Sequence, residues 1–382
     1  MNILIALTYY RPHYSGLTIY TERLARALAR HGHRVMVLTS RFDPNLPGLE
    51  IRDGVEIYRP RVLMRISKGV IMPTMPIWAF RLIRQADIVN LHVPQLDAAP
   101  ISVMSRLMGR PVVLTYHCDL HLPRGFVHKI ANGVSNLANH VAAMAANRLI
   151  TNTRDYAESS PFLQHYLSRT ESIVTPAELP PVDSDEIAHY REAWGVQPGQ
   201  RVIGMAARFA TEKGVEYLVE AMPAILQRYP TARVLFVGQH DNVLGEEEYA
   251  RRLAPLIDRI GPAWKFLGVV PSVALAAFFH MCEVTVLPSI NGTESFGIVQ
   301  IESMMSGTPV VATDLPGVRQ PVRMTGMGRV VPPRNAAALA EALIDVLDHP
   351  AQFRGDPAQV AQDFSPDTIA AHYEKIFGSV CS

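Results

Sequence analysis

The feature that most constrains the fold is an alternation of short apolar runs with amphipathic helical segments along the whole chain. Many of the apolar runs are rich in β-branched residues and lack a polar face, which is typical of parallel strands buried on both sides. Because the alternation recurs in both halves, it predicts two α/β domains, each a doubly wound parallel sheet. The expected strands cover residues 3–8, 35–39, 55–58, 88–92, 112–117 and 149–153 in the first half, and 201–206, 233–237, 265–268, 284–287 and 310–313 in the second.

The length of the chain also favours two domains. It has 382 residues, of which 48% are hydrophobic and 19% charged, and a single core stops growing near about 250–300 residues. We expect one domain over residues 1–178, a proline-containing linker over 179–199, and a second domain over 200–364. Residues 365–382 form a last helix that we expect to cross back onto the first domain.

Cysteine usage and hydropathy bear on location. The three cysteines show neither metal-ligand spacing nor a disulfide framework, which suits a reducing compartment. The first apolar run lacks a basic flank and is interpreted as a strand rather than a signal peptide. No apolar run reaches the ~18 residues of a membrane span. These features predict a cytoplasmic protein that is soluble or lies on the inner face of the cytoplasmic membrane.

Charge is divided unevenly along the chain. Residues 1–175 carry 20 Lys and Arg against 11 Asp and Glu, whereas residues 176–382 carry 16 against 24. Either the basic half faces an anionic acceptor or membrane, or the opposite charges help the two halves dock. The stretch 59–84 mixes arginines with apolar residues, and two interpretations stay open. It is a surface that lies on anionic lipid, or an ordinary packed segment with its arginines outward.

The most informative stretch follows the expected strand 284–287. A loop holds Glu294, and a helix is expected from about Phe296 to Ser306, with Glu302 on its second turn. The free N–H groups of a helix N-terminus attract phosphate. Glu302 lies about 9 Å along the axis from Phe296 at ~1.5 Å per residue. A nucleotide diphosphate sugar along this helix would place its sugar at Glu294 and its ribose at Glu302, because a carboxylate accepts hydrogen bonds from two adjacent hydroxyls.

Two cations are expected to complete this site. Arg208 and Lys213 lie in the loop after the expected strand 201–206, at the edge of the sheet where ligands bind. A guanidinium fork and an ammonium group suit a leaving diphosphate. The alternative, that they are surface charges, is less favoured for Lys213, because a lysine near a helix N-terminus opposes the helix dipole.

These motifs together resemble the signature of the retaining glycosyltransferases of family 4. The resemblance rests on Glu294-x7-Glu302 with Phe296-Gly297 between them, Gly307-Thr308-Pro309-Val310-Val311, Arg208 with Lys213-Gly214, residues 29–35, and residues 328–333 followed by a helix over 336–347. It implies the GT-B fold, in which two Rossmann-like doubly wound parallel-sheet domains face each other across a cleft. The first domain would bind the acceptor and the second the nucleotide sugar.

The resemblance also implies roles for single residues. Glu294 contacts the transferred sugar, Glu302 the ribose, and Arg208 and Lys213 the diphosphate. The further implied contacts are the backbone N–H groups of Phe296, Gly297 and Ile298, Gly16 beside the diphosphate, and His117 as an active-site histidine. The implied reaction transfers a hexose from a UDP- or GDP-linked donor to a hydroxyl of a lipid or growing glycan, with retention. It needs no metal or other cofactor, and nucleic acid is not among the implied partners.

Competing interpretations stay open. A nucleotide-sugar epimerase or a phosphorylase could use the same scaffold, and so could a non-catalytic sugar-nucleotide binding protein. His117 could be a buried histidine bonded to backbone, and His92 is interpreted as a packing residue. Asp183-Ser184-Asp185 has the form of a metal-binding Asp-x-Asp motif, but its place in the linker favours a helix N-cap instead.

Overall fold

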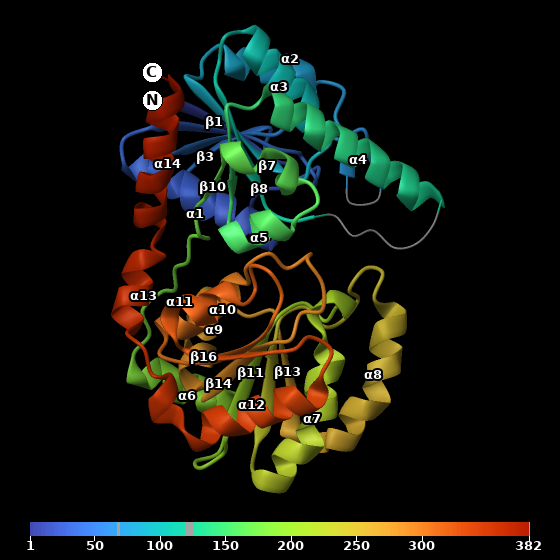
Figure 1. The fold of residues 1–382 in the computed structure, drawn as a ribbon, viewed down its shortest axis with the longest axis vertical. Coiled ribbons are helices and arrows are strands. Elements are labelled where there is room, and N and C mark those ends of the chain that lie inside the picture. The colour runs from blue at the N-terminus through green and yellow to red at the C-terminus, as the bar shows by residue number, and fades with distance from the viewer. Residues whose placement is uncertain (67–68, 120–125, 382) are drawn as a thin grey trace. The chain divides into compact units, whose positions relative to one another are not determined.

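The structure, a computed structural model, describes residues 1–66, 69–119 and 126–381 (Figure 1). The chain divides into two compact units. The first combines residues 1–176 with residues 364–382, and the second comprises residues 177–363. The last segment of the chain therefore belongs to the unit that the chain builds first.

The first unit is built on an eight-stranded sheet in the described residues, with the order β10-β9-β8-β7-β1-β2-β4-β3. All neighbours pair in parallel except β3, which runs antiparallel to β4 at the edge. The strands are β1 (Asn2–Ala6), β2 (Arg34–Leu38), β3 (Leu49–Arg52), β4 (Val55–Tyr58), β7 (Ile88–Val93), β8 (Val112–Tyr116), β9 (Arg148–Thr151) and β10 (Thr170–Ser172), and a separate hairpin joins β5 (Met64–Ile66) to β6 (Gly69–Ile71). The helices are α1 (Gly16–Arg30), α2 (Met75–Ile83), α3 (Ala98–Leu107), α4 (Phe126–Ala145), α5 (Arg154–Ser159) and α14 (Pro366–Cys381).

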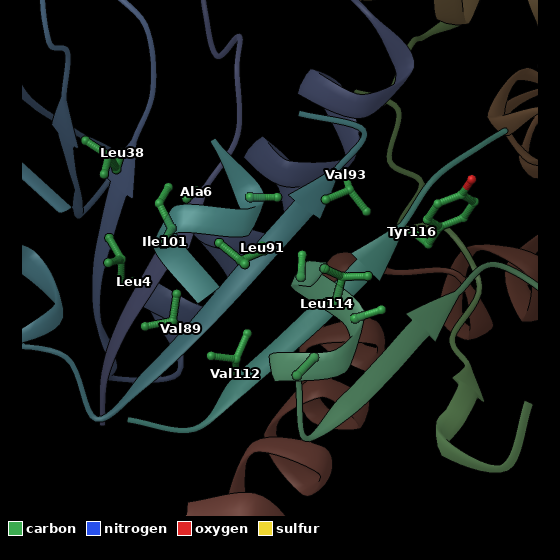
Figure 2. Close-up of a cluster of buried hydrophobic side chains, with 14 of the residues drawn as sticks. Leu4, Ala6, Leu38, Val89, Leu91, Val93, Ile101, Val112, Leu114 and Tyr116 are labelled. Atoms are coloured by element: carbon green, nitrogen blue, oxygen red, sulfur yellow. The ribbon is translucent and has the colours of Figure 1, made fainter. Parts of the chain in front are cut away.

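Both faces of this sheet are buried, and alternate residues of β1 serve the two faces. Ile3 and Ile5 pack with the buried residues of α1 and α14. Leu4 and Ala6 pack on the other face with residues of α2, α3 and α4, in the cluster that Figure 2 shows around Leu91. Helices α1 and α14 contact each other along the first face.

The second unit contains a six-stranded parallel sheet with the order β13-β12-β11-β14-β15-β16. Its strands are β11 (Val202–Ala206), β12 (Arg233–Val237), β13 (Trp264–Gly268), β14 (Val284–Leu287), β15 (Val310–Thr313) and β16 (Gly328–Val331). Its helices are α6 (Ser184–Ala193), α7 (Val215–Arg228), α8 (Glu247–Ile260), α9 (Ser272–Met281), α10 (Ile298–Met305), α11 (Gln320–Thr325), α12 (Ala336–Asp348) and α13 (Pro357–Asp363). Helices α7, α8 and α12 cover one face, and α6 and α9 pack on the other.

The strand orders fix where a ligand site can lie. In the second unit the order from β13 to β16 is that of nucleotide-binding Rossmann folds, with the reversal between β11 and β14. The first unit has the same kind of reversal between β1 and β7. Ligands bind outside the carboxyl ends of the strands at such a reversal. The loops that follow these strands are therefore the places to look for a site.

The sequence-based expectations missed some edge elements. The expected parallel strands are present, but β3, β10, β16 and the β5–β6 hairpin were not predicted, because short half-exposed strands lack a continuous apolar run. Asp183 caps α6 in a capping box with Glu186, so the N-cap prediction for the Asp-x-Asp motif is confirmed. No helix in the described part of the chain is both long enough and apolar enough to cross a lipid bilayer.

Candidate active site

Two loops interlock at the carboxyl ends of neighbouring strands β11 and β14. Gly214 follows β11 in the left-handed conformation, with φ of 64°, and a Cβ atom there would lie only 2.1 Å from the carbonyl oxygen of Pro288. The Ile290 N–H donates to the Glu212 carbonyl at 3.1 Å. Only a glycine permits this approach of the two backbones, so the loop after β11 is held against the loop after β14.

The interlocked loops bring Lys213 to Glu294. The ammonium Nζ of Lys213 donates to Oε2 of Glu294 at 2.5 Å, and the two side chains retain only 19% and 17% of their exposure. The pair sits at the strand-order reversal of the second unit, where the sequence predicted a sugar contact and a diphosphate contact. Each of these two charges therefore neutralises the other.

Helix α10 begins beside this pair. Its N-cap is Gly297, with φ of 80° and ψ of 74°, and a Cβ atom there would lie 2.3 Å from Cδ2 of Leu287. Among the described residues, the N–H groups of Gly297 and Ile298 have no hydrogen-bond acceptor. These two donors and the helix dipole offer a site for an anion.

The predicted start of this helix was wrong by two residues. We expected it from about Phe296, but α10 comprises Ile298–Met305, because Gly297 takes a left-handed conformation that cannot continue a helix. Glu302 is therefore about 6 Å along the axis from the first helical residue, rather than 9 Å from Phe296. Its side chain is buried, as is that of Phe296.

Gln300 holds the loop before α10, a role that the sequence analysis missed. Its Nε2 donates to the carbonyl oxygens of Phe296 at 2.8 Å and Val318 at 2.9 Å. Both bonds are buried, so Gln300 ties the turn at Phe296 to the segment after β15. With the helix start at Ile298, Gln300 lies in the first turn, and a glutamine near a helix start is a signal that could have pointed to this role.

Arg208 lies on the same loop as Lys213 but faces a different carboxylate. Its Nη2 donates to Oε1 of Glu212 at 2.7 Å, and its side chain is about half exposed. The loop thus presents two cations near the reversal point, each matched with a glutamate. Such an exposed pair contributes little to stability, so Arg208 can exchange Glu212 for an anionic ligand at small cost.

Gly16 opens helix α1 in the first unit. The preceding residue, Ser15, is the N-cap, and its Oγ accepts from the Thr18 N–H at 3.2 Å. A Cβ atom at Gly16 would meet no atom within 4 Å. The space beside Gly16 is therefore not taken by the chain itself, which leaves room for a group that approaches the helix N-terminus.

His117 follows β8 at the carboxyl edge of the same sheet and is buried. Its Nε2 lies 2.9 Å from Nδ1 of His92, which ends up beside it because β7 and β8 are neighbours. Burial lowers the pKa of His117 to about 3, and burial next to His117 also lowers the pKa of His92. Both rings are therefore neutral near pH 7. The packing interpretation of His92 overlooked this contact, although the sequence places His92, like His117, at the carboxyl end of a strand.

The carboxylate of Asp119 is hydrogen-bonded to neighbouring side chains. It accepts hydrogen bonds from the hydroxyls of Tyr116 and Ser160, each at 2.8 Å, and from Tyr156 at 3.0 Å. These bonds tie the segment after β8 to α5. Asp119 thus supports the position of His117 and has a structural role in this loop.

The structure thus gathers the candidate residues into two groups. Lys213, Glu294, Gly297 and Ile298 surround the start of α10 in the second unit, with Arg208 on the same loop as Lys213 and Glu302 inside the helix. His117 and Gly16 lie at the carboxyl edge of the first sheet. No three His, Cys, Asp or Glu side chains of the described segments are grouped as metal ligands.

Comparison with protein families matches both units. The model for glycosyl transferases group 1 matches residues 186–363, and the model for glycosyltransferase family 4 matches residues 14–160. The phosphatidyl-myo-inositol mannosyltransferase of Mycobacterium leprae is 30% identical over 376 residues, which cover 96% of this chain and 94% of that protein. The 2-deoxystreptamine glucosyltransferase of Streptomyces kanamyceticus is 28% identical over 392 residues, covering 93% and 98%.

Solved structures share the fold. Anabaena HepE in complex with UDP-glucose has a TM-score of 0.78 and 20% sequence identity, and the match covers 99% of this chain and all of that one. A match of this extent includes both Rossmann-like units. The architecture is thus that of the GT-B glycosyltransferases, as the sequence motifs predicted.

Proposed function

The chain belongs to the family 4 glycosyltransferases, and on this basis we propose that it transfers a hexose, with retention, from a UDP- or GDP-linked donor to a hydroxyl of a lipid or glycan acceptor. The observation that carries the proposal is the contact between Lys213 and Glu294 beside the first turn of α10. A cation, a carboxylate and free backbone donors meet there at the strand-order reversal, and a nucleotide diphosphate sugar has matching groups for all three.

The donor diphosphate exchanges partners with the protein when it binds. Its oxygens accept from the N–H groups of Gly297 and Ile298, and from Lys213, which leaves Glu294. The released carboxylate then accepts hydrogen bonds from two adjacent sugar hydroxyls. Glu302 takes the ribose hydroxyls, and Arg208 closes on the diphosphate.

These groups also account for the chemistry of the leaving group. As the bond from the anomeric carbon to the diphosphate breaks, negative charge develops on the phosphate oxygen, and Lys213, Arg208 and the α10 dipole stabilise it. Because these cations come from the protein, we propose that transfer needs no divalent metal. The acceptor hydroxyl attacks the face from which the diphosphate leaves and passes its proton to the leaving group, so the anomeric configuration is kept.

A donor screen tests this proposal directly. UDP, GDP and ADP sugars are added to the purified protein, and the unfolding temperature is followed. A matching donor at 100 times its Kd stabilises the protein by about 2.7 kcal/mol. The matching donor is then incubated with and without candidate acceptors, and the anomeric protons of the product are read by NMR. Release of a free epimer without acceptor, or no stabilisation by any donor, contradicts the proposal.

Metal dependence is tested with the same assay. Transfer is measured with and without a chelator, and full activity in the chelator is expected. Loss of transfer in the chelator that returns on addition of Mg²⁺ or Mn²⁺ would show that Lys213 and Arg208 do not suffice for the diphosphate.

An exposed surface of the first unit favours contact with an anionic lipid surface, where a lipid-linked acceptor would lie. The hairpin β5–β6, the following helix α2 and the residues that flank them expose Leu63, Met64, Ile71, Ile77 and Phe80, together with Arg61, Arg65, Arg81 and Arg84. Arg59 does not belong to this surface, because it is buried and paired with Glu50 at 2.7 Å. Apolar groups beside arginines bind the interface of anionic bilayers. We therefore propose that the enzyme docks there to reach a lipid-linked acceptor.

Vesicle sedimentation separates this docking from ordinary packing. We expect the protein to sediment with phosphatidylglycerol vesicles, less with phosphatidylcholine vesicles, and less after Ile77→Ser with Phe80→Ser. The matched control is Leu107→Ser, which removes an 83% exposed apolar side chain from the end of α3. Equal loss of binding in the control, or no sedimentation of the wild type, contradicts the proposal.

A further inference from the structure

A row of buried polar side chains runs beneath the carboxyl ends of β7 and β8. Asn90, His92, Thr115 and His117 are all buried in the sheet of the first unit. Oδ1 of Asn90 lies 2.6 Å from Nε2 of His92, and Nδ1 of His92 lies 2.9 Å from Nε2 of His117. His117 is a candidate site residue, whereas the other three have no part in the proposed contacts with substrate. Their hydrogen bonds set the protonation pattern of His117.

The contacts of Asn90 fix the direction in which hydrogen bonds are donated along this row. Its Nδ2 faces the carbonyl oxygen of Val113 at 3.2 Å and the hydroxyl of Thr115 at 3.0 Å. A carbonyl oxygen only accepts, so the amide nitrogen of Asn90 is the atom that donates there. Its Oδ1 is consequently the atom that faces His92, and an amide oxygen only accepts. Nε2 of His92 therefore carries a proton and donates it to Asn90.

The protonation of His92 in turn determines which atom donates between His92 and His117. Its ring is fully buried, and burial beside His117 lowers its pKa, so it is neutral and holds one proton. With that proton on Nε2, Nδ1 of His92 only accepts. Thr21 also lies 3.1 Å from this atom, and its single hydroxyl proton is within reach of both Nδ1 of His92 and the Leu17 carbonyl, at 2.9 Å. In either case Nε2 of His117 donates to Nδ1 of His92, because two unprotonated nitrogens at 2.9 Å would repel each other.

The protonation state of the other ring nitrogen of His117, Nδ1, follows from this arrangement. The ring is neutral and its proton is on Nε2, so Nδ1 holds a lone pair and accepts a hydrogen bond. Among the described residues Nδ1 forms no hydrogen bond, and it is not one of the buried unpaired polar atoms. Nδ1 is therefore the atom of this ring that is left for a ligand.

We propose that Asn90 and His92 are positioning residues that hold His117 in its neutral Nε2–H form, so that His117 offers substrate an acceptor atom at Nδ1. The group that meets this atom is a hydrogen-bond donor, a sugar or acceptor hydroxyl, and not a phosphate or carboxylate oxygen. The contact with substrate rests on the proposed transferase function, whereas the protonation pattern is a property of the unliganded protein.

The protonation pattern is read without substrate. The full chain is labelled with ¹⁵N in its histidine rings, and long-range ¹H–¹⁵N spectra at pH 7 distinguish protonated from unprotonated ring nitrogens. The signals of His117 are identified by their loss in His117→Asn. We expect Nε2 of His117 protonated and Nδ1 unprotonated. A proton on Nδ1, or a doubly protonated ring, overturns the proposal, and this spectrum needs no variant of His92.

Variants then test the origin of the pattern. His92→Phe removes the atom that accepts from His117, so the His117 signals should shift toward the other tautomer or a mixture. Thr21→Val is the matched control, because it removes the other contact of His92 and keeps its link to Asn90. We expect the control to leave the His117 spectrum unchanged. An unchanged spectrum in a folded His92→Phe protein overturns the assigned role of His92.

Donor analogues test the contact with substrate. Each sugar hydroxyl is replaced in turn by hydrogen and by fluorine, which accepts but does not donate. At one position we expect both replacements to lower kcat/KM by about two- to tenfold in the wild type, the range for one neutral hydrogen bond. In His92→Phe the difference should shrink. Fluorine that fully replaces every hydroxyl overturns the contact, whereas absence of turnover with any donor counts against the transferase function and leaves the spectra valid.

Discussion

Replacing Glu294 by glutamine is expected to tighten the binding of a bare nucleoside diphosphate while removing most sugar transfer. Nζ of Lys213 is held at 2.5 Å by Glu294, and a diphosphate that binds here has to draw it away. The substitution removes this competition but also removes the carboxylate that binds the sugar hydroxyls. The two activities should therefore move in opposite directions.

The magnitude follows from the exposure of the pair. An exposed ion pair is worth about 0.2–1 kcal/mol, and breaking a buried pair costs about 3–5 kcal/mol. The side chains of Lys213 and Glu294 are 19% and 17% exposed, and both stay solvated at one side, so we take about 1 kcal/mol. That value corresponds to a Kd about fivefold lower for Glu294→Gln. Lys213→Ala should instead raise the Kd by about 10- to 100-fold, since it removes a charged hydrogen bond of about 1.5–3 kcal/mol.

Isothermal titration of the matching nucleoside diphosphate measures both values, and turnover is measured in parallel. The matched control is Glu283→Gln, which removes a carboxylate paired with Arg201 at the other end of β14. The control should leave the Kd unchanged. The reasoning is refuted if Glu294→Gln binds the nucleoside diphosphate tenfold more weakly while circular dichroism shows an intact fold.

Three further predictions concern stability. Gly214→Ala should lower the free energy of unfolding by about 2–4 kcal/mol in urea titrations, because its Cβ would lie 2.1 Å from the Pro288 carbonyl at positive φ. The control Gly16→Ala should change the free energy of unfolding by less than about 1 kcal/mol. Equal effects of the two substitutions would contradict this prediction. Acidification from pH 7 to 5 should destabilise the first unit. The pKa of His117 is about 3 in the folded protein and about 6.5 in the unfolded chain, so below pH 6.5 the unfolded chain binds more protons. The free energy of unfolding should therefore fall by about 1.4 kcal/mol for each pH unit below 6.5. His117→Gln should flatten this dependence in urea midpoints, and an unchanged slope would argue against a neutral buried ring. Tyr373→Phe leaves the buried hydroxyl of Tyr20 without its 2.7 Å partner and should cost about 1–3 kcal/mol in thermal unfolding; a loss below about 0.5 kcal/mol would show that the hydroxyl finds another partner.

The central strands could be predicted from the sequence because they are buried on both faces. A strand such as β1 must be apolar at every position, since consecutive residues pack into opposite layers. Edge strand β3 has no such requirement, and its residues Leu49 and Ile51 are exposed. Its place is determined by pairing with β4, which depends on residues elsewhere in the chain.

The candidate site was predictable in its membership and not in its internal contacts. Lys213 and Glu294 were expected to touch different parts of a donor, but their contact spans 81 residues and depends on the turn at Gly214. The helix start was misplaced because a left-handed Gly297 is indistinguishable in sequence from a helical glycine. His92 was interpreted as packing because the pattern of one strand does not show which neighbour its side chains meet.

The place of the last helix in the chain has a consequence for folding during translation. Ile369, Tyr373 and Phe377 of α14 fill the apolar layer against α1, yet they are translated after the entire second unit. At about 5–20 residues per second, synthesis of the intervening chain takes roughly 10–40 s. During that time the apolar side of α1 that α14 later covers stays exposed in the nascent first unit, and the second unit can fold before the first is complete. A stop codon anywhere after residue 176 and before α14 therefore leaves the earlier-made unit unfinished.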